Sequence, residues 1–236
     1  MNQENIKFLR ANENHHFYAQ IIVDEMESSA KARGTGIAKR SPDYIKQKMS
    51  EGKAIIALTE DGTWAGFCYI ETWDGDYVAN SGLIVSPPFR KSGVAKAIKN
   101  EIFKLSREIY PNAKIFGLTT GLAVMKINSD LGYEPVTYSE LTQDEKFWAG
   151  CKSCVNYDIL MMKERKNCLC TAMLFDPKEN TPVEDVKEDF KENKDLYDRF
   201  MKIKQLKLLR PFMKKSKTMK STVGLKRIAA QLASFI

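Results

Sequence analysis

The residues best suited to chemistry lie between positions 83 and 95, where a β-rich run leads through a turn into a long helix. The strand ends in Leu83, Ile84 and Val85, and the turn into the helix is formed by Arg90, Lys91, Ser92, Gly93, Val94 and Ala95. Backbone N–H groups at the start of a helix lack partners within it and bind phosphate groups well. Gly93 permits a close approach of the main chain, and Arg90 and Lys91 add positive charge. The segment predicts a phosphate-binding loop, although a basic helix start without a ligand has the same pattern.

The patterns around this loop predict an ordered series of elements. Strands are expected at 6–10, 54–59, 64–72, 77–85, 114–119, 135–138, 157–162 and 169–175, and helices at 17–32, 41–52, 94–109 and 122–131. The helices rest on apolar residues at helical spacing, and the strands on β-rich runs between turn signals. Three consecutive strands joined by short turns indicate an antiparallel sheet. We therefore expect an α/β (α+β) fold, with a mixed, mostly antiparallel central sheet flanked by helices.

This order of elements resembles the GNAT family of CoA-dependent N-acyltransferases. The matching motif is Arg90-x-x-Gly93-x-Ala95 after the strand, and the end of the helix at Leu131-Gly132-Tyr133 is similar to the family's Leu-Gly-aromatic sequence. The resemblance covers roughly residues 6–175 and implies the GNAT fold. The segments 33–40 and 156–160 also resemble a bacterial subgroup associated with N-acylation of glutamate in arginine synthesis.

The resemblance implies acetyl-CoA, or another acyl-CoA, as the cosubstrate. The cosubstrate would lie where the strand 77–85 parts from the strand 114–119, with its pantetheine arm paired to the amides of Leu83 and Val85. The N–H groups of residues 91–95 would hold the pyrophosphate. An N–H group near Leu83 would polarise the thioester carbonyl, and a small-molecule amine would attack that carbonyl directly.

Three residues are candidates for the proton transfers that such an attack requires. Glu71 ends a strand beside the expected acceptor site and is the candidate base, although an exposed strand-end carboxylate fits equally. Asn80 on the central strand is a candidate to hold a water or an amide, or is a satisfied buried polar group. Asn128 stands where the family often has a tyrosine that acts as an acid on the CoA sulfur, and an amide is a poor acid.

The connection between the first two helices is expected to cover the acceptor. Its candidate binding residues are Arg33, Thr35, Lys39 and Arg40. Arginine binds carboxylates through two hydrogen bonds, so this loop favours a small acidic acceptor such as glutamate. A solvated basic loop, or one that contacts the CoA phosphates, remains an alternative.

Four cysteines are grouped near the end of the predicted domain, at Cys151, Cys154, Cys168 and Cys170. Two thiol pairs on two arms of a hairpin would suit a four-thiolate zinc site. Reduced core cysteines and a redox pair are the alternatives. Histidine occurs only at His15 and His16, which disfavours a histidine metal site or a hydrolase triad. Without an apolar leader or a membrane-spanning run, we expect a cytoplasmic protein with reduced thiols.

The net charge of +7 is confined to the end of the chain. Residues 1–177 carry 22 basic and 22 acidic side chains, residues 178–198 carry 4 and 8, and residues 199–236 carry 11 and none. We therefore expect a catalytic domain at 1–176, an acidic linker at 177–198 and a basic amphipathic helical tail at 199–236. The tail could pack on the domain, on a second copy in a homodimer, on a membrane surface or on a protein partner, and nucleic acid is disfavoured.

Two functions from different classes remain open. The first is an acyl-CoA-dependent N-acyltransferase. The second is a catalytically weak module that binds acyl-CoA and acts through its basic tail, which the missing tyrosine at Asn128 keeps in consideration.

Overall fold

A computed structural model describes residues 6–34, 39–73 and 75–179 of the chain. All elements named below lie in the unit Met1–Asp176. The predicted basic tail and all but the first three residues of the predicted acidic linker lie outside the described residues, so both remain predictions. Among the described residues, no helix is long and apolar enough to cross a membrane.

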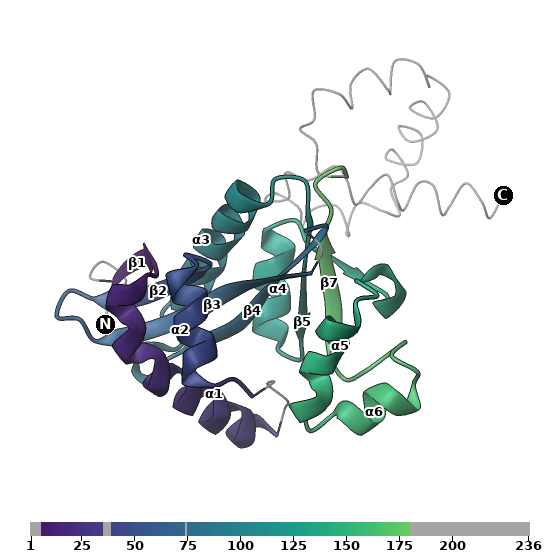
Figure 1. The fold of residues 1–236 in the computed structure, drawn as a ribbon, viewed down its shortest axis with the longest axis horizontal. Helices are drawn as coiled ribbons and strands as arrows, with labels where there is room; N and C mark the ends of the chain where they lie inside the picture. Colours follow the sequence, from purple (N-terminus) through teal and green to yellow (C-terminus); the bar gives the residue numbers. More distant parts are fainter. Residues whose placement is uncertain (1–5, 35–38, 74, 180–236) are drawn as a thin grey trace, which may run out of the picture. The chain divides into compact units, whose positions relative to one another are not determined.

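The centre of the unit is a seven-stranded sheet in the order β1-β2-β3-β4-β5-β7-β6 (Figure 1). The strands are β1 (Ile6–Arg10), β2 (Ala54–Thr59), β3 (Trp64–Trp73), β4 (Tyr77–Val85), β5 (Lys114–Thr119), β6 (Glu134–Val136) and β7 (Thr171–Phe175). Every neighbouring pair is antiparallel except β4 and β5, which are parallel. The predicted fold class, a mostly antiparallel sheet flanked by helices, is confirmed.

Helices cover both faces of this sheet. The back face, as we name it, carries α3 (Val94–Ile109) and α4 (Leu122–Asp130). The front face carries α1 (Ala19–Arg33), α2 (Pro42–Ser50), α5 (Glu145–Ala149) and α6 (Tyr157–Met162). Short 3-10 turns complete the chain at η2 (Glu13–Tyr18), η3 (Pro87–Phe89), η4 (Tyr138–Glu140) and η5 (Gly150–Ser153).

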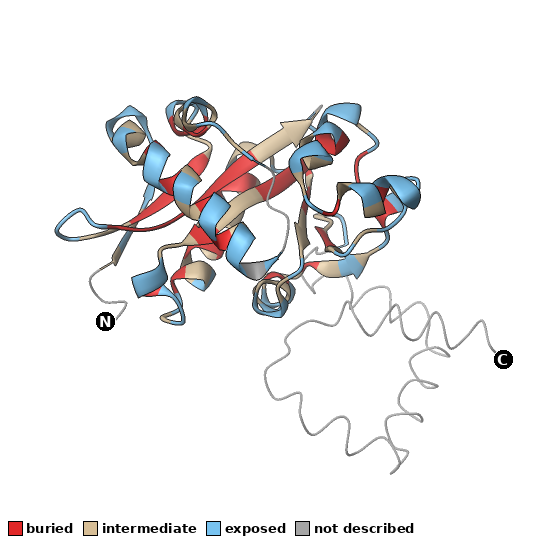
Figure 2. Cartoon of the chain, turned by 90° about the horizontal axis from the view of Figure 1, so that it is seen from below, coloured by how far each residue is buried: buried red, intermediate tan, exposed pale blue. Residues whose placement is uncertain are grey.

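The alternation of side chains along each strand divides the core between these faces. Val78 packs on the back with α3, whereas its neighbour Ala79 packs on the front with α5 and α6. Cys68 and Tyr69 on β3 divide in the same way. Buried residues therefore follow the sheet and the inner sides of the helices (Figure 2).

The predicted apolar stripe of α3 is the main support of the back face. Val94, Ile98, Ile102 and Leu105 are all buried against the sheet. Burial of such side chains is worth about 1.5–3 kcal/mol each before conformational entropy is subtracted. This helix therefore fixes the position of the preceding loop, which is the predicted phosphate site.

One predicted strand is wrong. Residues 157–162 form α6 instead, as part of the insertion that connects β6 to β7. The segment begins after Asn156 and carries Asp158 in its first turn, both favourable at a helix start. Three of its six residues are Leu or Met, which are not branched at Cβ, and only Leu160 is buried, so the alternating pattern of a half-buried strand is absent.

A bulge interrupts β4 next to the predicted cosubstrate residues. Phe67 pairs with Ile84 but Tyr69 pairs with Ser81, so that Gly82 and Leu83 together oppose one residue of β3. Gly82 has φ +65°. A bulge leaves one residue out of the regular ladder, which supplies the unpaired backbone expected near Leu83.

We predict that Gly82→Ala destabilises the fold through two separable effects. The positive φ costs about 1–2 kcal/mol for a residue with a Cβ, and the added Cβ meets the Tyr69 ring and lies 2.9 Å from Cε of Met26. The overlap adds about 1–3 kcal/mol. Gly75→Ala is the matched control, since Gly75 has φ +87° and open space. Urea denaturation that gives equal losses for the two variants would contradict the close packing at Gly82.

Candidate active site

The sheet opens between β4 and β5. Their parallel ladder comprises three pairs and ends where Ala79 faces Phe116. Beyond this point β4 continues only with β3, and β5 continues only with β7. Asn80 and Gly117 are thus the first residues at what we call the β4–β5 opening. The backbone edges of two central strands are freed here, which is an arrangement that can bind an extended ligand.

The predicted phosphate loop lies at the end of β4. Gly93 is the N-cap of α3 with φ 88°, and no side chain caps the helix. Lys91 also has a positive φ of 62°, and the Ser92 hydroxyl donates to the carbonyl oxygen of Phe89 at 2.6 Å. The N–H groups of the first turn of α3 are thus left without a side-chain partner, as a phosphate-binding helix start requires.

Arg90 lies in this loop but its guanidinium is turned toward α1. Nη2 forms an ion pair with Glu25 at 2.5 Å and donates to the Ser29 hydroxyl at 2.7 Å, and Nε donates to the carbonyl oxygen of Val85 at 3.1 Å. The charge predicted for a phosphate is therefore neutralised by a carboxylate. In this arrangement Arg90 fixes the loop to α1.

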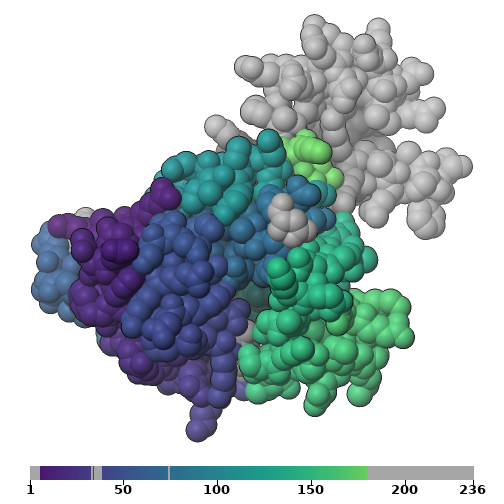
Figure 3. All heavy atoms as spheres, viewed as in Figure 1, coloured from purple at the N-terminus to yellow at the C-terminus, as the bar shows by residue number. Residues whose placement is uncertain are grey.

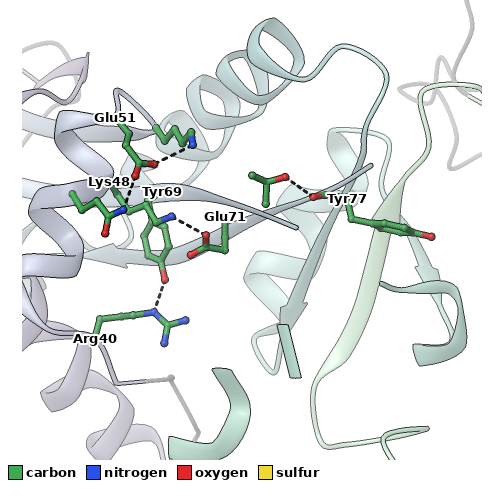
Figure 4. A network of polar contacts seen from close by, with 9 residues as sticks. Arg40, Lys48, Glu51, Tyr69, Glu71 and Tyr77 are labelled. Atoms are coloured by element: carbon green, nitrogen blue, oxygen red, sulfur yellow. Dashed lines mark hydrogen bonds and ion pairs between the residues drawn. The ribbon is translucent and has the colours of Figure 1, made fainter. Parts of the chain in front are cut away.

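On the front face, Glu71 forms a partly buried ion pair with Lys48 (Figure 4). Lys48 Nζ lies 2.7 Å from Oε1 of Glu71, and the two side chains are 8% and 16% exposed. Burial raises the pKa of Glu71 to about 7, while the nearby Arg40 guanidinium acts in the opposite direction. Burial also lowers the pKa of Lys48. Glu71 thus has the affinity for a proton that a base at neutral pH needs.

Arg40 is directed into the same site. Its Nε donates to the Tyr69 hydroxyl at 2.8 Å, and its guanidinium lies 5.2 Å from the centre of the Tyr44 ring. Lys48 Nζ lies 5.1 Å from the same ring centre. Two cations and two aromatic rings therefore adjoin Glu71, and Figure 4 shows Arg40, Tyr69 and Glu71 in one group.

The insertion between β6 and β7 forms the opposite wall. Arg40 Nη2 lies 3.9 Å from the Cβ position of an alanine at Gly150, and the backbone N–H of Lys39 donates to the Ser153 hydroxyl at 2.9 Å. Figure 3 shows the surface hollowed between the lobe of α1 and α2 and the lobe of α5 and α6. Lys39 and Arg40, at the described end of the connection predicted to cover an acceptor, therefore reach across to η5.

The other predicted acceptor residues differ from Arg40. The Lys39 side chain is 71% exposed and pairs with Glu27 at 3.2 Å, so it faces solvent. Thr35 and the side chain of Arg33 lie outside the described residues, and their roles remain predictions.

On the back face, Asn80 is the centre of a buried polar network. Its Nδ2 donates to the Ser106 hydroxyl at 2.8 Å. Its Oδ1 accepts from the Tyr133 hydroxyl at 3.0 Å and from Lys99 Nζ at 3.3 Å. Its oxygen accepts two hydrogen bonds and its amide nitrogen donates one, which agrees with the prediction of a buried polar group with partners. The residue nevertheless stands at the beginning of the opening.

Asn128 is almost completely buried beside β5. Its Nδ2 donates weakly to Met173 Sδ at 3.7 Å and is 3.6 Å from the Cβ position of an alanine at Gly117. Its Oδ1 has no hydrogen-bond partner within the described part of the chain. An unpaired buried acceptor is costly, so this oxygen is suited to a ligand N–H or a water.

The four cysteines do not form the predicted metal site. In the ranges that the structure describes, no group of three or more His, Cys, Asp or Glu side chains could hold a metal ion. All four thiols are free, and they lie in or beside turns rather than on the arms of a hairpin. Burial raises the pKa of Cys151 to about 11 and that of Cys170 to about 12. Burial therefore favours the neutral thiol at these two positions.

Several residues of this site were not predicted from the sequence. They are Tyr44, Lys48, Tyr69, Lys99 and Tyr133. The spacing of Lys99 and Ser106 is a signal in the sequence that could have identified Lys99. The two polar residues are seven positions apart, so they lie on the same side of α3, and both are buried. No local pattern connects Lys48 with Glu71, since they meet only through the packing of α2 on β3.

The chain was compared with protein families and with curated protein sequences. Residues 23–123 match the Acetyltransferase (GNAT) family. A comparison with curated protein sequences gives no match.

Solved structures share the fold at low sequence identity. N-acetylglutamate synthase from Neisseria gonorrhoeae, complexed with coenzyme A and N-acetyl-glutamate, is 15% identical with a TM-score of 0.52, over 74% of this chain and 36% of that chain. Rv2747 from Mycobacterium tuberculosis, in complex with CoA and NLQ, is 16% identical with a TM-score of 0.53, over 72% and 98%. A phosphinothricin acetyltransferase from Sinorhizobium meliloti, in complex with AcCoA, is 13% identical with a TM-score of 0.50, over 73% and 88%. The match spans about a third of the Neisseria enzyme and nearly all of Rv2747.

We predict that Lys48→Met destabilises the fold in a pH-dependent manner. The variant leaves Glu71 buried without its cation, which costs about 3–5 kcal/mol when the carboxylate is charged. Below about pH 7 the carboxyl can take up a proton, so the loss of unfolding free energy is smaller at pH 5.5 than at pH 8.5.

The matched control is Lys46→Met on the same helix, because Lys46 is 41% exposed and pairs only with the exposed Asp43. A surface change of this kind alters stability by no more than about 0.5 kcal/mol. If urea denaturation gives the same loss of unfolding free energy for Lys48→Met and Lys46→Met at both pH values, the Lys48–Glu71 pair does not stabilise the fold.

Proposed function

We propose that this domain, which matches the Acetyltransferase (GNAT) family over residues 23–123, is an acyl-CoA-dependent N-acetyltransferase. We propose further that its acceptor is the amine of a small acidic amino acid such as glutamate. The observation that carries this proposal is the group formed by Arg40, Tyr69, Lys48 and Glu71 at the β4–β5 opening. It combines cations that bind carboxylates with a carboxylate that accepts a proton. Acylation of glutamate would belong to arginine synthesis.

On the cosubstrate side, acyl-CoA would enter through the β4–β5 opening. The free edge of β4 at Leu83, Ile84 and Val85 suits the amides of pantetheine, and the unoccupied N–H groups after Gly93 suit the pyrophosphate. The bulge at Gly82 supplies a backbone N–H that would polarise the thioester carbonyl and stabilise the oxyanion that forms on attack.

On the acceptor side, Glu71 would remove the proton. An amino group is mostly protonated at neutral pH and must lose a proton before it attacks. The Glu71 carboxylate has the required proton affinity, and Lys48 keeps part of it ionised. The carboxylate lies on the strand residue that pairs with Ala79, which is the last residue before the opening.

The preference for an acidic acceptor would come from Arg40. A guanidinium held by Tyr69 and backed by Tyr44 is fixed in direction, and it still has donors left for a carboxylate. The Neisseria structure contains N-acetyl-glutamate. Acetylation of glutamate at the present site would release the same compound. A basic acceptor such as lysine would place its charge beside two cations.

We predict that Glu71→Gln lowers kcat/KM by about 10²–10⁴-fold, the usual contribution of a general base. In the unchanged protein kcat/KM decreases as the pH falls below about 7, because the protonated carboxyl cannot accept a proton. The variant lacks this acidic limb, whereas Glu60→Gln in the exposed β2–β3 turn keeps it. If Glu71→Gln retains the acidic limb of the kcat/KM profile, Glu71 is not the base.

The acceptor is tested by thiol release from acetyl-CoA and succinyl-CoA with the full chain against glutamate, glutamine, aspartate and lysine. We expect glutamate to be the best acceptor. Arg40→Gln should raise its KM by about 10–100-fold, the value of one charge-assisted hydrogen bond, whereas Arg10→Gln at the sheet edge should not. Preference for lysine would reject the acidic acceptor, and CoA binding without turnover of any amine would favour the binding module.

A further inference from the structure

Helix α3 buries a lysine that has no carboxylate partner among the residues that the structure describes. Lys99 is 2% exposed. Its Nζ donates to Asn80 Oδ1 at 3.3 Å and lies 5.2 Å from the centre of the Tyr133 ring. Within the described ranges no carboxylate pairs with it. A buried unpaired ammonium costs several kcal/mol, so this position is expensive to maintain for packing alone.

Lys99 lies beside the β4–β5 opening. Asn80, which accepts from Lys99, is the first residue of β4 after the parallel ladder ends. The Tyr133 hydroxyl, from the segment after α4, donates to the same oxygen. The ammonium is therefore held at the start of the opening. Asn80 of β4 contacts it from one side of the opening, and Tyr133, which follows α4, contacts it from the other.

Lys99 and Glu71 approach the opening from opposite faces. Glu71 pairs with Ala79 and points to the front, where Lys48 contacts it. The next residue, Asn80, points to the back, where it contacts α3. A thioester between β4 and β5 would thus have a proton acceptor on the face where the amine enters. It would have a proton-bearing group on the other face.

Of the titratable groups gathered around Asn80 on the back face, Lys99 is the one whose pKa lies near that of a thiol. Burial raises the pKa of Tyr133 well above 10 and that of Cys68 to about 11. Burial lowers the pKa of Lys99 to about 8, and the Cys68 charge acts in the opposite direction. A thiol has a pKa near 8.5, so the proton transfer from Lys99 to a thiolate is nearly balanced. Asn128, at the family's tyrosine position, has no ionisable proton to give.

We propose that Lys99 is the general acid that protonates the leaving sulfur of CoA, an inference that rests on the proposed acyl transfer. The amine nitrogen forms a bond to the carbonyl carbon and gives its proton to Glu71. The carbon–sulfur bond then breaks, the electron pair goes to sulfur, and a proton moves from Lys99 Nζ to that sulfur. The products are the amide, CoA with a free thiol, a protonated Glu71 and a neutral Lys99.

Burial assists both halves of this cycle. The neutral lysine formed in the transfer no longer carries the desolvation cost of a buried charge. Ser106 and Tyr133 orient Asn80, which in turn directs the ammonium. After CoA leaves, water that enters the opening takes the proton from Glu71 and returns one to Lys99.

The test compares Lys99→Met with Lys104→Met, since Lys104 is on the same helix but 70% exposed. Each variant is assayed with acetyl-CoA and with its selenoester analogue. Selenolate is a much weaker base than thiolate and leaves without a proton. We expect Lys99→Met to lower kcat with acetyl-CoA by about 10²-fold, with little change in KM, and to have a small effect with the selenoester. Lys104→Met should behave as the unchanged protein.

The pH profile of the unchanged protein supplies a test that needs no variant. With acetyl-CoA, kcat should fall above about pH 8 as Lys99 loses its proton, and with the selenoester this basic limb should be absent. The same limb with both donors, or equal losses for Lys99→Met with both donors, would overturn the proposal. If the unchanged protein acylates no amine, the proposed function fails instead, which is a distinguishable result.

Discussion

The parallel ladder between β4 and β5 contains three residue pairs, and the candidate site is arranged around the point where it ends. Two central strands that separate leave backbone donors and acceptors without partners, and such groups must be satisfied by something else. In this chain, α3 and the helix-start loop lie on the back face, and Arg40 and Glu71 lie on the front face. The separation therefore creates both a place for a long cosubstrate and two faces from which residues reach it.

Each of these two faces carries buried or partly buried titratable groups. On the front, Glu71 and Lys48 share a partly dry environment that brings their proton affinities closer together. On the back, Lys99 is buried with no anion beside it in the described part of the chain, and it is directed by Asn80. Desolvation drives the shifts at all three groups, because each charged form loses water that its partners replace incompletely. The same packing that stabilises the domain thus adjusts its acids and bases.

The prediction from sequence succeeded where local signals were strong. The apolar stripe of α3, the strands 54–59 and 77–85, and the Gly93 helix start were placed correctly because periodicity and turn residues specify them locally. It failed at 157–162, where a short apolar run could be either strand or helix. It also missed the roles of Lys48 and Arg90, because their partners lie 23 and 65 residues away in the sequence.

The sequence by itself determined the fold class, the family resemblance, the helix start at Gly93 and the position of the positive charge in the last 38 residues, since these depend on residue types and their spacing. Only the tertiary structure decided which side chains meet. It brought Glu71 to Lys48 and Asn80 to Lys99, turned Arg90 toward α1, and left the cysteines as free thiols. The physical reason is that pair distances and desolvation depend on packing between distant segments, which no local pattern records.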